Sequence, residues 1–206
     1  MLELSQTQVL ELLARQHAVR EDRRAALKGR LQHFQRLGFP AGLNTGRGRA
    51  AVYDLPTVLA LLIAFEILQM GLSGERVVQI MRVRDDFVPR AAGAAGQFLG
   101  EKAGLLTPHR IHAFDEETDS VLLIFDPNAL SNFSQGDDEP ADITAWGDSI
   151  IFDGQVIKQR VRWCVVNTTL LIASASEHIC DISGLTASEF AEEVIELGGP
   201  NKGYPE

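Results

Sequence analysis

The segment DLPTVLALLIAFEILQMG, residues 54–71, determines how the first third of the chain folds. Asp54 is suited to cap a helix because its side chain can accept hydrogen bonds from backbone N–H groups of the first turn, and Pro56 fits that turn. Gly71 follows the last apolar residues, as glycine commonly does where a helix ends. The segment therefore predicts a helix over 55–70 that is the core helix of its domain.

Two more helices are predicted before this segment. The first covers residues 7–17, where polar residues interrupt an apolar pattern. The second covers residues 21–37 and carries an apolar stripe made of Leu27, Leu31, Phe34 and Leu37. Its polar stripe consists of Lys28, Gln32 and Arg36 at i, i+4 and i+8, which predicts that these three side chains face outward. Gly38 and then Pro40 end this helix.

Residues 42–54 join the second helix to the core helix and differ from both in composition. Turn-forming residues at the centre of the segment are followed by Val52 and Tyr53, which favour a strand. The pattern predicts a short hairpin with a basic tip formed by Arg47 and Arg49.

After the core helix, helices and strands alternate. Residues 73–82 predict a short helix, and the Ala- and Gly-rich residues 85–103 predict a connecting helix, although Pro89 and the glycines disfavour it. The apolar run 120–126 predicts a buried strand. Residues 131–142 predict a solvated loop, and residues 148–162 predict a hairpin with an Asp-Gly turn.

The last part of the chain predicts the end of a strand and two helices. Residues 165–166 finish the strand, after which Asn167 and Thr168 are suited to cap a helix that runs toward His178. An extended strand to Ala173 is the alternative, and we favour the helix. The sequence Thr186-Ala-Ser-Glu189 is a capping box, which predicts a final helix that ends at Gly198.

The net charge of −9 is distributed unevenly along the chain. Residues 1–50 hold nine Lys and Arg against four Asp and Glu, whereas residues 91–206 hold six against nineteen. The chain is thus a basic head on an acidic body. Such a head can bind phosphates locally, because salt screens the distant acidic charge over a Debye length of about 8 to 10 Å.

The order of predicted parts over residues 20–82 resembles the DNA-binding domain of the MerR family. The residues that carry the resemblance are Leu31-Gln-His-Phe-Gln-Arg-Leu-Gly-Phe-Pro40, the wing Arg47-Gly-Arg49, Tyr53-Asp54-Leu55 and Ala64-Phe-Glu-Ile-Leu-Gln-Met-Gly-Leu-Ser73. The resemblance implies a winged helix-turn-helix, in which a recognition helix enters the major groove and the wing reaches the backbone or the minor groove.

By position, the resemblance implies that Arg49 and Tyr53 hold phosphates, with Arg47 beside them. Glycines in the same loop would let the chain approach a duplex closely, and guanidinium groups match phosphate oxygens or a narrow minor groove. The second predicted helix carries the side-chain types that pair with guanine, adenine and phosphate. The candidate DNA-binding residues are Arg23, Arg24, Lys28, Gln32, Arg36, Arg47, Arg49 and Tyr53.

The chain departs from the MerR pattern in two respects. An extra N-terminal segment precedes the recognition helix, and the long coiled coil by which family members dimerise is not visible after residue 82. The predicted fold class is α+β. It comprises an all-α winged helix-turn-helix domain at 1–82, a helical connector at 83–104, a small acidic α+β domain for dimerisation or sensing at 105–198, and a disordered tail at 199–206.

Other chemistry-bearing residues carry less weight. His109 and His112 stand at i and i+3 without a third placed ligand, which does not make a metal site. His178 and Cys180 lack an oxyanion-hole signature, and the Arg/Gly loop lacks the Lys-Ser/Thr of a P-loop. We interpret both cysteines, Cys164 and Cys180, as buried small hydrophobes. We interpret Trp146 and Trp163 as core residues, with a small-ligand pocket as the alternative.

The same features predict where the protein works. An apolar helix needs about eighteen residues without charge to cross a membrane, and Glu66 interrupts the core helix. The segment Met1-Leu-Glu-Leu-Ser lacks the pattern of a secretion signal. We therefore expect a cytoplasmic, nucleoid-associated protein without a cofactor, a metal or an enzymatic activity.

The predicted function is sequence-specific binding of double-stranded DNA by a homodimer that forms through the C-terminal domain. Repression is favoured over activation, although the position of the site relative to the promoter decides between them. One alternative is an adaptor whose basic head contacts RNA polymerase or another acidic partner. The other alternative is a regulator that senses a ligand in its C-terminal domain.

Overall fold

The computed structural model describes residues 1–43, 50–83, 87–101, 120–125, 127, 143–144 and 164–199. Within these ranges the chain forms seven α-helices, a short 3₁₀ helix and two small antiparallel sheets. This mixture confirms the predicted α+β class. The winged helix-turn-helix stays a prediction, because the tip of the predicted wing lies outside the described residues.

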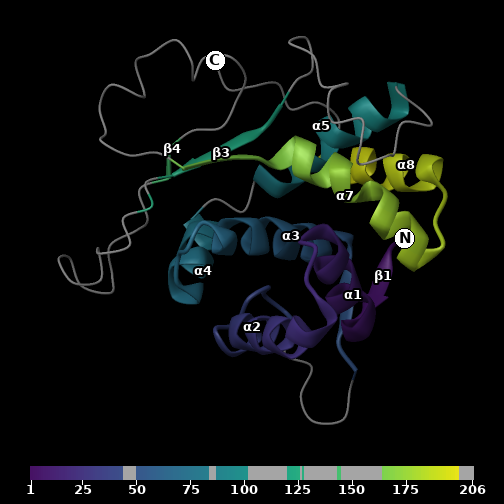
Figure 1. Ribbon diagram of the computed structural model, residues 1–206. Helices are drawn as coiled ribbons and strands as arrows, with labels where there is room; N and C mark the ends of the chain where they lie inside the picture. The colour runs from purple at the N-terminus through teal and green to yellow at the C-terminus, as the bar shows by residue number, and fades with distance from the viewer. Residues whose placement is uncertain are drawn as a thin grey trace.

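Helix α3 (Leu55–Gln69) lies at the centre of the molecule (Figure 1). Asp54 caps its first turn, since its Oδ1 accepts a hydrogen bond from Thr57 N at 3.1 Å. Nine of its side chains are buried, and they point to all sides of the helix. A helix that is apolar all round must be surrounded by other elements, so α3 is the core helix that the sequence predicts.

Strands β1 (Glu3–Ser5) and β2 (Val52–Asp54) form a two-stranded antiparallel sheet. Leu4 lies opposite Tyr53, and both side chains are buried, whereas the residues on either side of each are exposed. This alternation directs one face of the sheet into the core. Strand β2 confirms the strand predicted at Val52 and Tyr53, but its partner β1 was not predicted.

The two strands lead directly into helices. Helix α1 (Gln6–Gln16) begins after β1 with Ser5 as its N-cap, just as α3 begins after β2 with Asp54. A 3₁₀ helix, η1 (Glu21–Arg23), then leads into α2 (Arg24–Arg36), and α4 (Gly74–Val83) follows α3. All the predicted helices of the first third are therefore confirmed, and the sheet sets the directions of α1 and α3.

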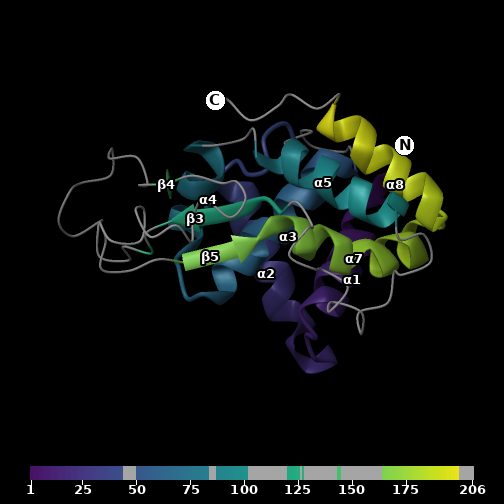
Figure 2. The same ribbon diagram turned by 90° about the horizontal axis from the view of Figure 1, so that it is seen from above.

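Helix α5 (Phe87–Glu101) packs against helix α8 (Ala187–Gly198), and the two lie side by side in Figure 2. A Cβ atom added to Gly96 would lie 2.6 Å from Ile195 Cγ1, so the two helices approach each other more closely than a side chain allows. The predicted connecting helix is thus confirmed. Two of the glycines that disfavoured it, Gly93 and Gly96, let it pack closely against α8, and Ala91 and Ala95 beside them are fully buried.

The second sheet has the strand order β4-β3-β5, and both pairings are antiparallel. It consists of β3 (Leu122–Phe125), β4 (Ile143–Thr144) and β5 (Cys164–Asn167). Strand β3 is the predicted buried strand, with Leu123 and Phe125 fully buried. Strands β3 and β5 lie side by side in Figure 2, and β5 leads directly into helix α7 (Thr168–Ser183).

Helix α7 (Thr168–Ser183) joins the second sheet to the N-terminal helices. Asn167 caps the helix, because its Oδ1 accepts a hydrogen bond from Leu170 N at 2.9 Å. Thr168 Oγ1 donates to the carbonyl of Val121 at 2.6 Å, which ties the first turn to the start of β3. The helix therefore contacts α1, α3 and α5 as well as the sheet. The predicted helix is confirmed, and the alternative strand to Ala173 is wrong.

One cluster of buried side chains extends across residue 82, where the sequence predicts a domain boundary. Leu12 and Leu59 belong to it, as do Ile172 and Phe190 from the other side of that boundary. The division into domains stays a prediction, and in the described residues the two parts share packed core. Among these residues, no helix combines the length and the apolar character that a membrane span requires.

Three further predicted segments, besides the tip of the wing, lie outside the described ranges. They are the solvated loop at 131–142, the hairpin at 148–162 and, apart from Gly199, the tail at 199–206.

Candidate nucleic-acid interface

The outer face of α2 carries the polar stripe that the sequence predicts. Lys28, Gln32 and Arg36 are all exposed, whereas Leu27, Leu31 and Phe34 on the opposite face are buried. The spacing of four residues places the three polar side chains above one another along one side of the helix. We call these three residues the α2 stripe.

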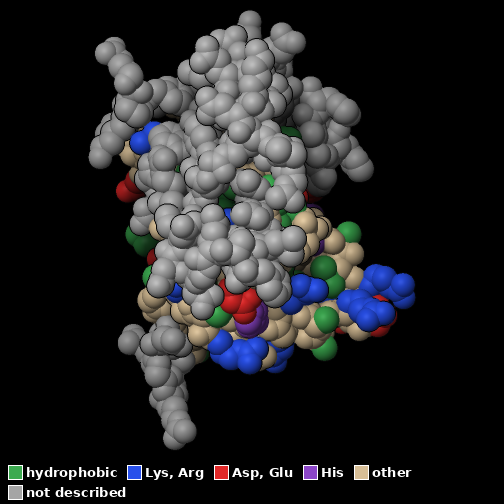
Figure 3. Space-filling model, turned by 90° about the vertical axis from the view of Figure 1, so that its left-hand side faces the viewer, with side chains coloured by type: hydrophobic (Ala, Val, Ile, Leu, Met, Phe, Trp, Pro, Cys, Tyr) green, Lys and Arg blue, Asp and Glu red, His purple; other side chains and the backbone are tan. Residues whose placement is uncertain are grey.

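The two cations of the α2 stripe have no role in holding the described fold together. Neither Lys28 nor Arg36 forms an ion pair with any residue that the structure describes, and the same is true of Arg30. In Figure 3, Lys and Arg side chains gather on the lower part of the visible face, where α2 lies in Figure 1. These charges are therefore available to an anionic partner.

Small residues accompany the α2 stripe on the same side of the helix. Ala25 and Gly29 are exposed, and a Cβ atom added to Gly29 would have no atom within 4 Å. A glycine inside a helix costs about 0.8–1 kcal/mol relative to alanine. No packing contact in the described structure explains Gly29, and a partner could approach the helix backbone closely at this point.

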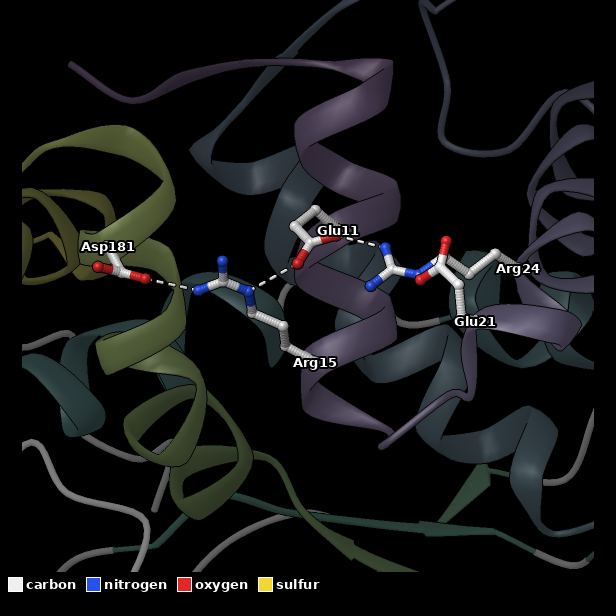
Figure 4. Close-up of polar contacts among 5 residues, drawn as sticks. All are labelled: Glu11, Arg15, Glu21, Arg24 and Asp181. Atoms are coloured by element: carbon white, nitrogen blue, oxygen red, sulfur yellow. Dashed lines mark hydrogen bonds and ion pairs between the residues drawn. The ribbon is translucent and has the colours of Figure 1, made fainter.

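Arg24, a predicted DNA contact, is engaged within the protein. Its Nη1 bonds Glu11 Oε2, and its Nε forms an ion pair with Glu21 Oε2 at 2.6 Å (Figure 4). Glu11 in turn accepts a hydrogen bond from Arg15 Nε at 2.8 Å. Arg15 Nη1 also lies 2.5 Å from Asp181 Oδ2 on α7. We call these five side chains the charge network.

The charge network affects the protonation of its central carboxylate. The guanidinium of Arg24 and then that of Arg15 lower the pKa of Glu11, because each donates a hydrogen bond to the charged form. Glu11 therefore stays ionised and keeps both arginines in place. Arg23, by contrast, is exposed, and its nearest partner is Asp22 at 3.7 Å. Of the two neighbouring arginines, Arg23 is the one free to meet a partner.

Tyr53, a predicted phosphate contact, lies in the core. Its side chain is fully buried, and its hydroxyl accepts a hydrogen bond from Gln35 Nε2 at 2.6 Å. Burial raises the pKa of the phenol, and the bond from Gln35 opposes that change. In the described structure Tyr53 thus attaches α2 to the β1–β2 sheet.

The C-terminal end of α2 is held by α4. Gly38 takes the left-handed conformation with φ of +71°, as predicted for a residue that ends a helix. Arg82 Nη2 donates to the carbonyl of Leu37 at 2.7 Å, which satisfies a backbone group that the helix itself leaves unpaired. His33 Nε2 lies 3.1 Å from Glu75 Oε1. Contacts at both ends therefore set the orientation of the α2 stripe.

The structure leaves two predicted site residues undescribed and shows one basic residue that the predictions omit. Arg47 and Arg49 lie outside the described residues, whereas β2, which follows them in sequence, is described. Arg30 is exposed on α2 but away from the α2 stripe. The i, i+4 series that starts at Lys28 does not contain Arg30, whereas a helical projection of residues 24–36 places it among the exposed positions.

The weaker candidates show no site among the described residues. His178 and Cys180 are two residues apart on α7, so they lie on different sides of the helix. Cys164 and Cys180 are half-buried rather than buried and are not joined by a disulfide. No group of three or more His, Cys, Asp or Glu side chains is placed to hold a metal in this part of the chain. His109, His112, Trp146 and Trp163 lie outside the described residues.

No protein-family model matches this chain, and neither a curated protein nor a solved structure matches it. The resemblance to the MerR family therefore rests on the residues quoted from the sequence.

Proposed function

We propose that this protein is a MerR-like transcription regulator that binds double-stranded DNA through the outer face of α2. The observation that carries the proposal is the α2 stripe: Lys28, Gln32 and Arg36 are exposed at intervals of four residues, and its two cations are unpaired among the described residues. Cations that do not stabilise the fold are available for phosphate or base contacts.

The chemistry of the α2 stripe fits the major groove of B-DNA, which is wide enough to admit an α-helix. Lys and Arg donate to guanine O6 and N7, and Gln can pair with adenine N6 and N7. Ala25 and Gly29 leave room for the helix backbone to approach the duplex. Arg23, in η1 just before α2, and the wing residues Arg47 and Arg49 would hold the adjacent phosphates.

The remaining parts of the proposal follow from the predicted domain organisation. Residues 105–198 would form a homodimer, so that two copies of α2 read two half-sites spaced by one or more helical turns of DNA. Binding would repress rather than activate transcription, in the cytoplasm on the nucleoid. The proposal contains no catalytic step and no cofactor. The competing function is a contact between the same basic face and RNA polymerase. Only the DNA-binding function predicts that the protein selects particular DNA duplexes.

The first experiment selects bound duplexes from a random DNA library and then measures the affinity of the best duplex over a series of salt concentrations. We expect Lys28→Ala and Arg36→Ala each to weaken binding about tenfold, and to lower the slope of log affinity against log salt by about 1 for each phosphate that is no longer neutralised. Gln32→Ala should broaden the selected sequence at one position, because this substitution removes a hydrogen bond to a base rather than to a phosphate.

Arg30→Ala is the matched control for these variants. It removes the same charge from the same helix, but its side chain lies away from the α2 stripe. We expect its affinity to stay within about twofold of the wild type, because removing a charge outside the interface has little effect at moderate salt. Equal losses for Arg30→Ala and Arg36→Ala would show that the head binds by overall charge alone. Selection of no preferred duplex would favour an acidic protein partner and contradict the proposal.

A further inference from the structure

The charge network links three parts of the molecule that are far apart in sequence (Figure 4). Glu21 and Arg24 belong to η1 and the first turn of α2, and Glu11 and Arg15 belong to α1. Asp181 belongs to α7, in the C-terminal part of the chain. Positive and negative groups alternate along the network, so each charge has an opposite charge next to it.

The first turn of α2 depends on this network for its electrostatics. No side chain caps the helix, and its first residue is Arg24. A cation at this end is unfavourable, because the helix dipole places partial positive charge on the N-terminal N–H groups. Glu11 and Glu21 supply the negative charge that offsets this effect. The network therefore holds the end of α2 that a cap would otherwise hold.

Arg24 also has a particular place relative to the α2 stripe. It precedes Lys28 by four residues, so it would extend the stripe by one turn toward the N-terminus if its side chain were free. Its side chain is one-third exposed and turns instead toward Glu11. Arg24 is consequently the one residue of this series that is used inside the protein.

We infer that Arg24 positions α2 for DNA instead of contacting DNA, and that Asp181 of α7 contributes to DNA affinity through Arg15 and Glu11. This inference rests on the proposed function of the α2 stripe. The network fixes the angle of α2 relative to α1, and α1 is fixed in turn to α7. A residue of the C-terminal part thereby affects how well the stripe fits the groove.

Glu11→Gln gives opposite results for the two roles that Arg24 could have. If Arg24 positions α2, removal of the Glu11 charge loosens the first turn and weakens binding by about fivefold, the equivalent of two partly exposed ion pairs. If Arg24 is a phosphate contact that Glu11 restrains, the same substitution frees it and strengthens binding. Stronger binding would overturn the inference.

Salt dependence supplies a second readout, which a phosphate contact and a positioning residue affect differently. We expect Arg24→Ala to lower affinity without changing the slope of log affinity against log salt, because the same number of phosphates stays neutralised. Arg24→Lys should recover part of the affinity, because one amine can replace only one of the two ion pairs. A slope that falls by about 1 in Arg24→Ala would show a direct phosphate contact and contradict the inference.

Asp181→Asn tests whether the effect reaches α2 from α7. We expect it to weaken binding about twofold, less than Glu11→Gln, because Asp181 is the most remote member of the network from α2. Glu3→Gln is the matched control, since it removes the same charge from an exposed site outside the network. An affinity for Asp181→Asn that equals that of Glu3→Gln would remove α7 from the inference.

Hydrogen exchange of the unbound protein separates failure of the inference from failure of the proposed function. If the wild type selects no duplex, the DNA-binding function fails, but the network can still be shown to hold α2. We then expect faster exchange of the first-turn amides of α2 in Glu11→Gln than in Glu3→Gln. Equal exchange in the two variants would show that the network does not position the helix.

Discussion

In the α5–α8 contact, a Cβ atom added to Gly96 would lie 2.6 Å from Ile195 Cγ1 and 2.9 Å from Ile195 N, whereas one added to Gly29 on α2 would have no atom within 4 Å. Both residues are glycines within helices, where alanine has the higher intrinsic propensity. Gly96 is required by the neighbouring helix α8, because a methyl group at this position would clash with the backbone of Ile195. No neighbouring segment of the described structure requires a glycine at position 29.

The two glycines therefore mark two kinds of surface. The α5–α8 contact is a closed surface, because another helix covers it, and the outer face of α2 at Gly29 is an open surface, because no described residue covers it. At α5, the low helix propensity of Gly96 is offset because α8 can approach closely and bury the neighbouring alanines. At α2, no packing contact in the described part of the chain offsets the low helix propensity of Gly29. A helix glycine therefore has to be explained by what lies next to it, and at Gly29 the proposed neighbour is a duplex.

The largest expected effect is at the closed surface. Gly96→Ala should lower the free energy of unfolding by about 2 kcal/mol, because the added methyl group forces α5 and α8 apart. Gly100→Ala on the same helix is the control, since its Cβ would meet only Ile195 Cδ1 at 4.0 Å. Urea denaturation of both variants checks the prediction. A Gly96→Ala protein as stable as Gly100→Ala would mean that the two helices are not in close contact.

The buried side chain of His17 predicts that the stability of the protein depends on pH. This side chain is 7% exposed and its Nε2 has no partner among the described residues, while its Nδ1 lies 2.6 Å from Gln69 Nε2 and 3.6 Å from Glu66 Oε2. Burial lowers the pKa of His17 from its usual 6.5. As the pH falls below that value, the unfolded chain takes up a proton before the folded chain does, so stability decreases.

The slope that His17 contributes is at most about 1.4 kcal/mol per pH unit, and it lies between pH 6.5 and the lower folded-state pKa. Burial raises the pKa of Glu66, which acts in the opposite direction as that carboxyl takes up its proton. The measurement is the free energy of unfolding against pH for the wild type and for His17→Leu. The variant should show a flatter curve below pH 6.5, and parallel curves would show that His17 is not held neutral by burial.

The smallest expected effect is at the open surface, and it has the opposite sign. Gly29→Ala should raise the free energy of unfolding by about 0.5–1 kcal/mol, because alanine favours the helix and its methyl group meets nothing. The same variant should bind the selected duplex more weakly, by about threefold, if the α2 backbone approaches DNA. A variant that is more stable and binds equally well would show that Gly29 is not needed for close approach.

The sequence predicted helix ends well because capping is local. Asp54, Asn167 and Thr186 each accept a hydrogen bond from an amide three residues later. Gly38 ends α2 in the left-handed conformation, which glycine adopts without a steric penalty. These interactions involve neighbouring residues only, so the pattern of residue types was sufficient to predict them.

The sequence did not predict interactions between distant residues. Strand β1 has three residues and is recognisable only because β2, nearly fifty positions later, pairs with it. The outward or inward direction of Tyr53 follows from that pairing, which places its ring in the core beside Leu4. The role of Arg24 follows from Glu11 on another helix.

By itself, the sequence determined the α+β class, the principal described helices and the amphipathic division of α2, because each depends on residue types at fixed short spacing. Only the tertiary structure decided that Gly96 is buried between two helices and that Gly29 faces open space. The physical reason is that a missing side chain has a fixed local cost in helix propensity, whereas its effect on packing is not local. What it permits depends on the atoms of another segment, and the order of residues along one helix does not specify where those atoms lie.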